Sequence, residues 1–142
     1  MRAVALSDQV LADPTFADVQ AQTRQAEGRP PIDLVHLARA TDGDEALESE
    51  LLAMFDRQSA KLAERVTFAD LPRRARADIA HRLRGSALAI GAFAVAEAAE
   101  AVETIFEAEG GEPEGAGALE GALVALAEAV AEARAAIAEL AV

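Results

Sequence analysis

Apolar residues recur every three or four positions along most of this chain, from residue 32 to residue 140, a spacing that places them on one side of an α-helix. The pattern predicts a short helix and four longer ones, over residues 32–40, about 44–66, 71–90, 92–109 and 118–140. Nowhere do apolar and polar residues alternate as they do in a strand. Because helices joined by short loops favour antiparallel neighbours, we expect an all-α, up-down antiparallel four-helix bundle with an extra short N-terminal helix or helices.

Capping and helix-breaking residues set the expected helix ends. Asp42 or Asp44 can accept a hydrogen bond from the first turn of the second helix. Residues 67–72 form a break, where we expect Asp70 to cap the third helix and Pro72 to lie in its first turn. The helices are therefore separated by recognisable turns.

The first 31 residues are less regular than the rest. Asp13-Pro14 could start a short helix around residues 16–25, which must end before Pro30-Pro31. We interpret residues 1–31 as an N-terminal extension, partly helical or loosely ordered, and residues 32–142 as the bundle domain. The initial Met and the end of the chain soon after the last helix favour a free-standing protein.

Composition narrows the class of protein. Apolar residues make up 52% of the chain, but aromatic residues only 4%, so Leu, Ile, Val and many Ala must build the core. The absence of cysteine excludes disulfides, thiol catalysis and cysteine-ligated zinc. We find no signal peptide, no membrane-spanning run and no second large apolar face. We therefore expect a cytoplasmic monomer without a membrane partner.

The charge is strongly negative but uneven. A net charge of −12 argues against nucleic acid as a partner, because phosphate binding needs clustered cations. Residues 93–142 hold eleven Glu against the single cation Arg134. Residues 71–92 are instead basic, with Asp78 as their one acid and five arginines: Arg73, Arg74, Arg76, Arg82 and Arg84. This basic segment contains His81.

The third helix directs His81 away from the core. At 100° per residue, one side of it carries Ile79, Leu83, Ser86, Ala87 and Ile90. The opposite side carries His81 with Arg84, Gly85 and Leu88, joined one or two turns earlier by Ala77 and Arg74. His81 thus has a cation at i+3 and no side chain at i+4.

The residues around His81 favour a role for it as a nucleophile. A neutral imidazole nitrogen is a competent nucleophile near pH 7 when the other ring nitrogen is held by an acceptor. Gly85 costs about 1 kcal/mol of helix propensity relative to Ala, which suggests that a partner backbone or a phosphoryl group needs the space beside His81. Arg84 can neutralise phosphoryl oxygens. Arg74, Ala77, Arg82 and Leu88 are the candidate partner-docking residues.

The run His81-Arg82-Leu83-Arg84-Gly85-Ser86-Ala87, followed by Ile90-Gly91-Ala92, closely resembles the phosphorylation motif of histidine-containing phosphotransfer (HPt) domains. The resemblance extends over about residues 32–110, with Arg84 where the family usually has Lys. It implies that His81 is phosphorylated and that Glu103, on the neighbouring helix, accepts a hydrogen bond from its ring. It also implies a response-regulator receiver domain or a (hybrid) histidine kinase as partner, with Mg²⁺ on the receiver and no cofactor in this chain.

Two alternatives to a phosphohistidine carrier remain. The chain could be a non-catalytic docking module that binds a receiver or kinase through the same face. Asp33-x-x-His36 and Asp78-x-x-His81 resemble half of a di-metal helical motif, but that site would require His81 to face inward. We expect His36 to be a partly buried structural residue at the end of the bundle. The chain is too short for an ATP-dependent kinase and lacks a glycine-rich nucleotide loop, so whether it counts as an enzyme stays open.

Overall fold

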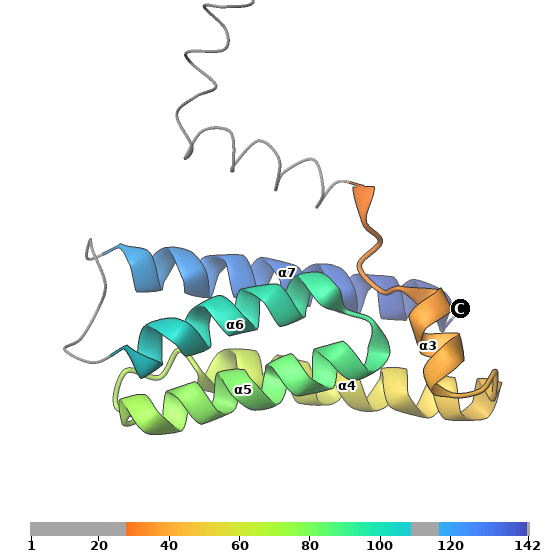
Figure 1. The fold of residues 1–142 in the computed structure, drawn as a ribbon, viewed down its shortest axis with the longest axis horizontal. Coiled ribbons are helices and arrows are strands. Elements are labelled where there is room, and N and C mark those ends of the chain that lie inside the picture. Colours follow the sequence, from red (N-terminus) through yellow and green to blue (C-terminus); the bar gives the residue numbers. More distant parts are fainter. Residues whose placement is uncertain (1–27, 109–116, 142) are drawn as a thin grey trace, which may run out of the picture. The chain divides into compact units, whose positions relative to one another are not determined.

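The computed structural model describes residues 28–108 and 117–141 (Figure 1). The chain divides into two units, Met1–Pro30 and Pro31–Val142, and the helices named below belong to the second unit. The helix predicted around residues 16–25 lies outside the described residues and stays a prediction.

Four long helices form the bundle, and a short one precedes them. The described residues form no strand, and their helices are α3 (Leu34–Ala40), α4 (Glu45–Arg65), α5 (Arg73–Ile90), α6 (Phe93–Glu107) and α7 (Ala118–Leu140). Each long helix packs against two others, because α5 and α7 both contact α4 and α6, while α3 contacts α5 (Figure 1). The expected all-α four-helix bundle with an extra short N-terminal helix is confirmed. None of the helices in this part of the chain is long and apolar enough to cross a membrane.

The helices begin and end within about two residues of the predicted positions. Asp44 caps α4, because its carboxylate accepts a hydrogen bond from the backbone nitrogen of Leu47 at 3.1 Å. The prediction that Asp70 caps the third helix is wrong. Pro72 occupies the N-cap position of α5 with an extended ψ of 150°, and its carbonyl accepts the first helical hydrogen bond from Arg76 at 3.0 Å. Asp70 therefore lies two residues outside the cap.

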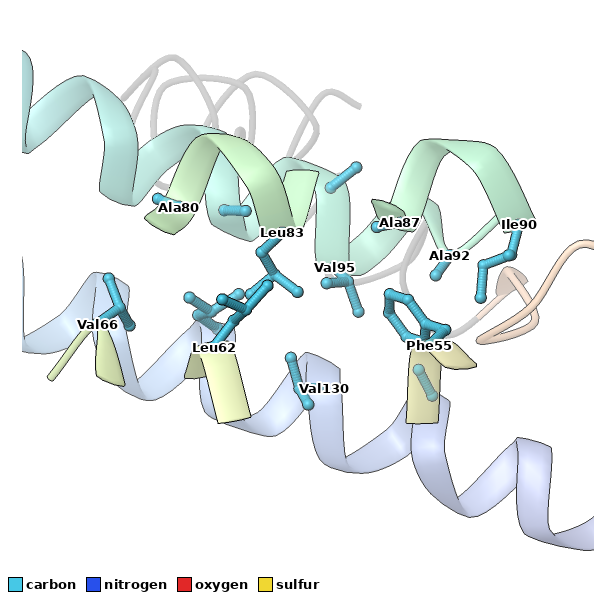
Figure 2. Close-up of a cluster of buried hydrophobic side chains, with 14 of the residues drawn as sticks. Phe55, Leu62, Val66, Ala80, Leu83, Ala87, Ile90, Ala92, Val95 and Val130 are labelled. Atoms are coloured by element: carbon cyan, nitrogen blue, oxygen red, sulfur yellow. The ribbon is translucent and has the colours of Figure 1, made fainter. Parts of the chain in front are cut away.

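Small and branched side chains fill the interior. Figure 2 shows Phe55 and Leu62 of α4 in one interior cluster with Leu83 of α5, Val95 of α6 and Val130 of α7. Several core positions are alanines with no exposed surface, which allows the helices to approach closely: Ala80, Ala87, Ala99 and Ala133. The core therefore contains few aromatic side chains, and its small residues allow the helices to pack closely.

A glycine makes the tight turn between α5 and α6. Gly91 has a φ of +83°, a left-handed conformation that side chains with a Cβ rarely adopt. A Cβ added there would lie 2.8 Å from the backbone oxygen of Asp33, whose own nitrogen donates a hydrogen bond to the Gly91 oxygen at 2.9 Å. The turn after α5 therefore also anchors the start of α3.

Two arginines attach the start of α5 to its neighbours. Arg76 is buried, and its Nε donates to the backbone oxygen of Val66, which follows α4, at 2.9 Å. Arg73 donates to the oxygen of Ile105 in α6 at 2.7 Å, and both guanidinium groups lie over the ring of Phe106. Burial, and secondarily the nearby charge of Arg73, lowers the pKa of the Arg76 guanidinium. These contacts set the position of α5 against α4 and α6.

Candidate functional site

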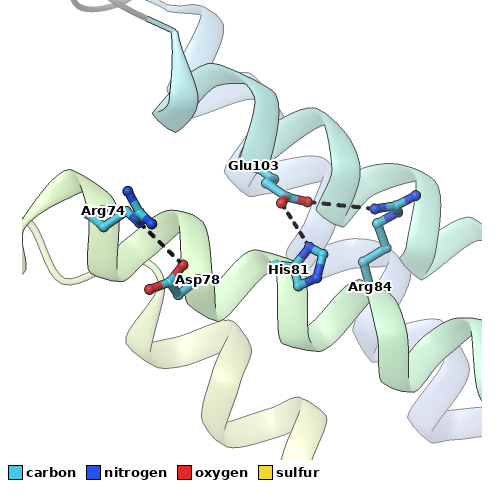
Figure 3. A network of polar contacts seen from close by, with 5 residues as sticks. All are labelled: Arg74, Asp78, His81, Arg84 and Glu103. Carbon is cyan, nitrogen blue, oxygen red and sulfur yellow. Dashed lines mark hydrogen bonds and ion pairs between the residues drawn. The ribbon is translucent and has the colours of Figure 1, made fainter.

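His81 stands on α5 with most of its side chain in solvent and with one ring nitrogen bonded to α6. The His81 side chain is 64% exposed, whereas that of Glu103 is only 12% exposed. Nδ1 of His81 lies 2.9 Å from Oε2 of Glu103 (Figure 3). The structure thus brings together two residues that are 22 positions apart in the sequence.

The bond to Glu103 selects one form of the neutral ring. An ionised carboxylate can only accept hydrogen bonds, so the proton of a neutral His81 must lie on Nδ1. The lone pair is then on Nε2, the nitrogen that does not face Glu103. A ring held in this form is ready to act as a nucleophile through Nε2 without first losing a proton.

Arg84 approaches the same carboxylate from the next turn of α5. Its Nη1 lies 4.0 Å from Oε1 of Glu103, and its side chain is 36% exposed (Figure 3). His81 and Arg84 therefore face different oxygens of one carboxylate. The predicted cation is beside the histidine, and part of its side chain is exposed to solvent.

Gly85 leaves open space on the surface. A Cβ added to this residue would meet nothing within 4 Å, so the protein's own packing does not require glycine there. Its helical position carries the ordinary glycine penalty in helix propensity without a compensating internal contact. The geometry is compatible with a need for space that arises only when another molecule approaches.

A groove of about 490 Å³ runs beside His81 between α5 and α6. Its lining is mixed, with buried Ala77 and Phe106 among charged groups. The other lining residues are Arg74, Asp78, His81, Glu103 and Glu107. Arg74 and Asp78 pair only loosely at 3.8 Å, with both side chains mostly in solvent (Figure 3). The groove gives an approaching protein access to the histidine.

The predicted docking residues divide into exposed and buried positions. Arg74, Arg82 and Leu88 are exposed, as a docking role requires. The expectation that Ala77 contributes an exposed apolar surface is wrong, because only 2% of it is exposed. α5 buries a second flank against α6 in addition to its core stripe, and Ala77 lies on that flank.

The residues of the two Asp-x-x-His motifs make contacts other than metal ligation. Asp33 caps α3 by accepting from the backbone nitrogen of His36 at 3.0 Å. His36 is half-buried, with its ring edge-on to Phe93 at 5.1 Å between centroids. Asp78 faces Arg74. Within residues 28–108 and 117–141, no three carboxylate or histidine side chains are grouped closely enough to hold a metal ion.

Two features of the site escaped the sequence interpretation. Phe106 borders the groove and also lies beneath Arg73 and Arg76, one turn beyond Glu103. The sequence could have placed Phe106 beside Glu103, because it follows Glu103 by three residues and residues i and i+3 share a helix face. The burial of Arg76 had no such signal, since its partner is a backbone oxygen from another part of the chain.

An exposed histidine whose ring is hydrogen-bonded to a carboxylate therefore lies on the flank of a four-helix bundle. The sequence matches the Hpt domain over residues 45–136, which is more than half of the chain and includes His81 and Glu103. The chain belongs to the Hpt domain family, whose activity is histidine phosphotransfer in two-component signalling. No curated protein and no solved structure matches it.

Proposed function

We propose that this chain carries a phosphoryl group on Nε2 of His81, accepting it from and returning it to aspartates of response-regulator receiver domains. A (hybrid) histidine kinase is the other partner that can supply the group. The observation that carries the proposal is the 2.9 Å bond from His81 to Glu103 on a ring that stays 64% exposed. A cytoplasmic location, where such partners act, belongs to the same proposal.

The chemistry needs no proton to leave the attacking nitrogen. The lone pair of Nε2 attacks the phosphorus of an aspartyl phosphate, and an N–P bond forms. The bond between phosphorus and the aspartate oxygen breaks, and the aspartate leaves as a carboxylate with the bonding electrons. The phosphorylated ring keeps its proton on Nδ1, where the Glu103 carboxylate balances the positive charge that develops on the ring. The reverse steps return the phosphoryl group to an aspartate.

Arg84 and Gly85 support this transfer in different ways. The guanidinium of Arg84 offers several N–H donors for phosphoryl oxygens, and it replaces the lysine usual in the family. Gly85 leaves room for the phosphoryl group or for the partner's backbone. We expect Mg²⁺ to be bound by the partner receiver domain, where it would neutralise further phosphoryl charge.

Docking of the partner follows from the exposed residues around the histidine. Leu88 is 40% exposed and offers apolar contact, while Arg74 and Arg82 offer positive charge. The basic surface contrasts with the strongly acidic remainder of the chain, so it favours a partner with acidic groups around its phosphorylation site. Ala77 takes no direct part, because it is buried.

The decisive experiment is transfer of radioactive phosphoryl groups from a panel of phosphorylated receiver domains. The wild-type chain is expected to acquire a label that is labile in acid and stable in base. The His81→Gln variant is expected to acquire none. The His36→Gln variant is the matched control, because His36 is the other histidine of the chain and packs against Phe93 instead of facing the groove.

Two outcomes would contradict the proposal. Labelling of the His81→Gln protein at the wild-type rate would reject the site. A wild-type chain that binds receivers without ever acquiring label would favour a docking module instead.

A further inference from the structure

A second hollow lies at one end of the bundle, where Figure 1 shows α3 beside the start of α4 and the end of α7. It has a volume of about 310 Å³, and its floor contains Leu37 and Leu52, which are 1% and 9% exposed. An adjoining hollow of about 110 Å³ between α4 and α7 shares Ser49, Leu52 and Leu140 with it. The two hollows form one cleft, the α3–α4–α7 cleft, and none of its described lining residues borders the groove beside His81.

Two exposed leucines border this cleft from different helices. Leu34 of α3 is 50% exposed and Leu140 of α7 is 47% exposed, and both line the larger hollow. Single exposed apolar side chains are ordinary on a protein surface, but these two continue an apolar floor. An apolar side chain that entered the cleft would remove both leucines from water together. The cleft therefore favours a partner with apolar side chains.

The rim of the cleft on α4 is acidic. Glu45 and Glu48 line it, and residues 41–50 hold five acids and no Lys or Arg. The carboxylate of Glu48 accepts a hydrogen bond from the Thr41 hydroxyl at 3.0 Å, which holds it at the rim. Glu45 is exposed and has no hydrogen-bond or ion-pair partner among residues 28–108 and 117–141. This rim favours a partner that carries positive charge beside its apolar side chains.

An amphipathic helix with basic residues on its polar side meets both requirements. Helices bind in grooves through apolar side chains spaced by three and four positions, and two adjoining hollows suit two such side chains. We propose that the α3–α4–α7 cleft binds a basic amphipathic helix of a second protein while His81 stays free for its own partner. The chain thus has two separate docking surfaces, and the second one does not depend on the proposed phosphotransfer.

The probe is a synthetic helical peptide of about 18 residues, with Leu at positions spaced by three and four and Lys at the others. Its binding to the full-length protein is measured by fluorescence anisotropy in about 0.15 M salt, where exposed charges more than about 8 Å apart are largely screened. The Lys peptide is expected to bind. A peptide with the same leucines but Glu in place of Lys is expected to bind about tenfold more weakly.

The apolar contact is tested at the two exposed leucines. Leu34→Asn and Leu140→Asn are each expected to raise the Kd of the Lys peptide about fivefold, because each removes an apolar side chain that the peptide would cover. Val124→Asn is the matched control, since Val124 is 52% exposed on α7 and lines neither hollow. It is expected to leave the Kd unchanged.

The acidic rim is tested by reversing one charge. Glu45→Lys is expected to raise the Kd of the Lys peptide about threefold, the size typical of an exposed ion pair. Glu132→Lys makes the same change of charge at an exposed position of α7 that lines neither hollow, and it is expected to leave the Kd unchanged. Equal effects of the two substitutions would attribute binding to the net charge of −12 and overturn the proposal.

The remaining outcomes test the occupant and the separation of the two surfaces. A wild-type chain that sediments as a dimer, but as a monomer after Leu34→Asn, would assign the cleft to a second copy and overturn the proposal. Transfer of label from a phosphorylated receiver to His81 is expected to keep its rate with the Lys peptide bound, and loss of transfer would overturn the separation. A chain that binds the peptide as expected but never acquires label would reject the proposed function and leave this inference supported.

Discussion

Replacement of Gly85 by alanine is expected to stabilise the free protein and to slow its phosphotransfer. The new Cβ would meet nothing within 4 Å, so the substitution adds no steric strain to the bundle. Gly85 lies within α5 and is not among the residues with a positive φ, so alanine suits its backbone. Removing a helical glycine gains about 1 kcal/mol of unfolding free energy, part of it through the lower entropy of the unfolded chain.

The stability gain is measurable by urea or thermal unfolding. For a domain of this size, about 1 kcal/mol corresponds to an increase of about 4 °C in Tm. Gly121→Ala is the matched control, because Gly121 is also helical, lies on α7, and would carry a Cβ with nothing within 4 Å. Both variants are expected to be more stable than the wild type.

Transfer kinetics separate the two variants. The methyl group of Gly85→Ala stands one turn from His81, where it would displace an approaching receiver domain or phosphoryl group. Because small misplacements of reacting groups are costly, we expect kcat/KM for transfer from a phosphorylated receiver to fall about tenfold. Gly121→Ala is expected to transfer at the wild-type rate.

The reasoning fails in two ways that the assays can detect. Wild-type transfer by Gly85→Ala would show that the space beside His81 is not used. Loss of stability in that variant would show that the surface there is not open. Phosphoramidate, a small chemical phosphoryl donor, adds a further distinction. Normal labelling of Gly85→Ala by it would assign the space to the partner's backbone, and slow labelling would assign it to the phosphoryl group itself.

Two further predictions concern the contacts that hold α5 in place. Gly91→Ala is expected to lower the unfolding free energy by about 2 kcal/mol, because it combines a left-handed backbone with a Cβ 2.8 Å from the Asp33 oxygen. Urea unfolding measures this loss. An unchanged unfolding free energy would contradict the turn geometry. Arg76→Met is expected to cost about 2 kcal/mol, because it removes the donor to the Val66 oxygen and the guanidinium stacked on Phe106. Arg82→Met, at an exposed position, is its control, and equal effects of the two substitutions would refute the role of burial.

Much of the fold was predictable because its signals are local. Helical periodicity and turn residues located all five helices of the described chain within about two residues. The caps were less certain, since Asp44 caps its helix but Asp70 does not. A side chain with cap-forming chemistry is only a candidate, because the preceding turn decides which residue occupies the N-cap position.

The candidate site was predictable only in part. The outward position of His81 and its relation to Arg84 and Gly85 follow from one helix, whose geometry is fixed at 100° per residue. The pairing with Glu103 came from the resemblance to a family, because nothing local relates residues 22 positions apart. The burial of Ala77 was missed because a helical wheel shows one apolar stripe, whereas α5 packs against more than one neighbour.

The sequence alone determined where the helices lie, which side of α5 carries the histidine, and which residues follow it at i+3 and i+4. These properties depend on hydrogen bonds and spacings within a single helix. Only the tertiary structure decided that a nearly buried carboxylate faces His81 and Arg84 together, that Arg76 reaches the end of α4, and that Ala77 is covered. Those properties depend on how far each helix is rotated and displaced against its neighbours, and that is settled by the packing of the whole core.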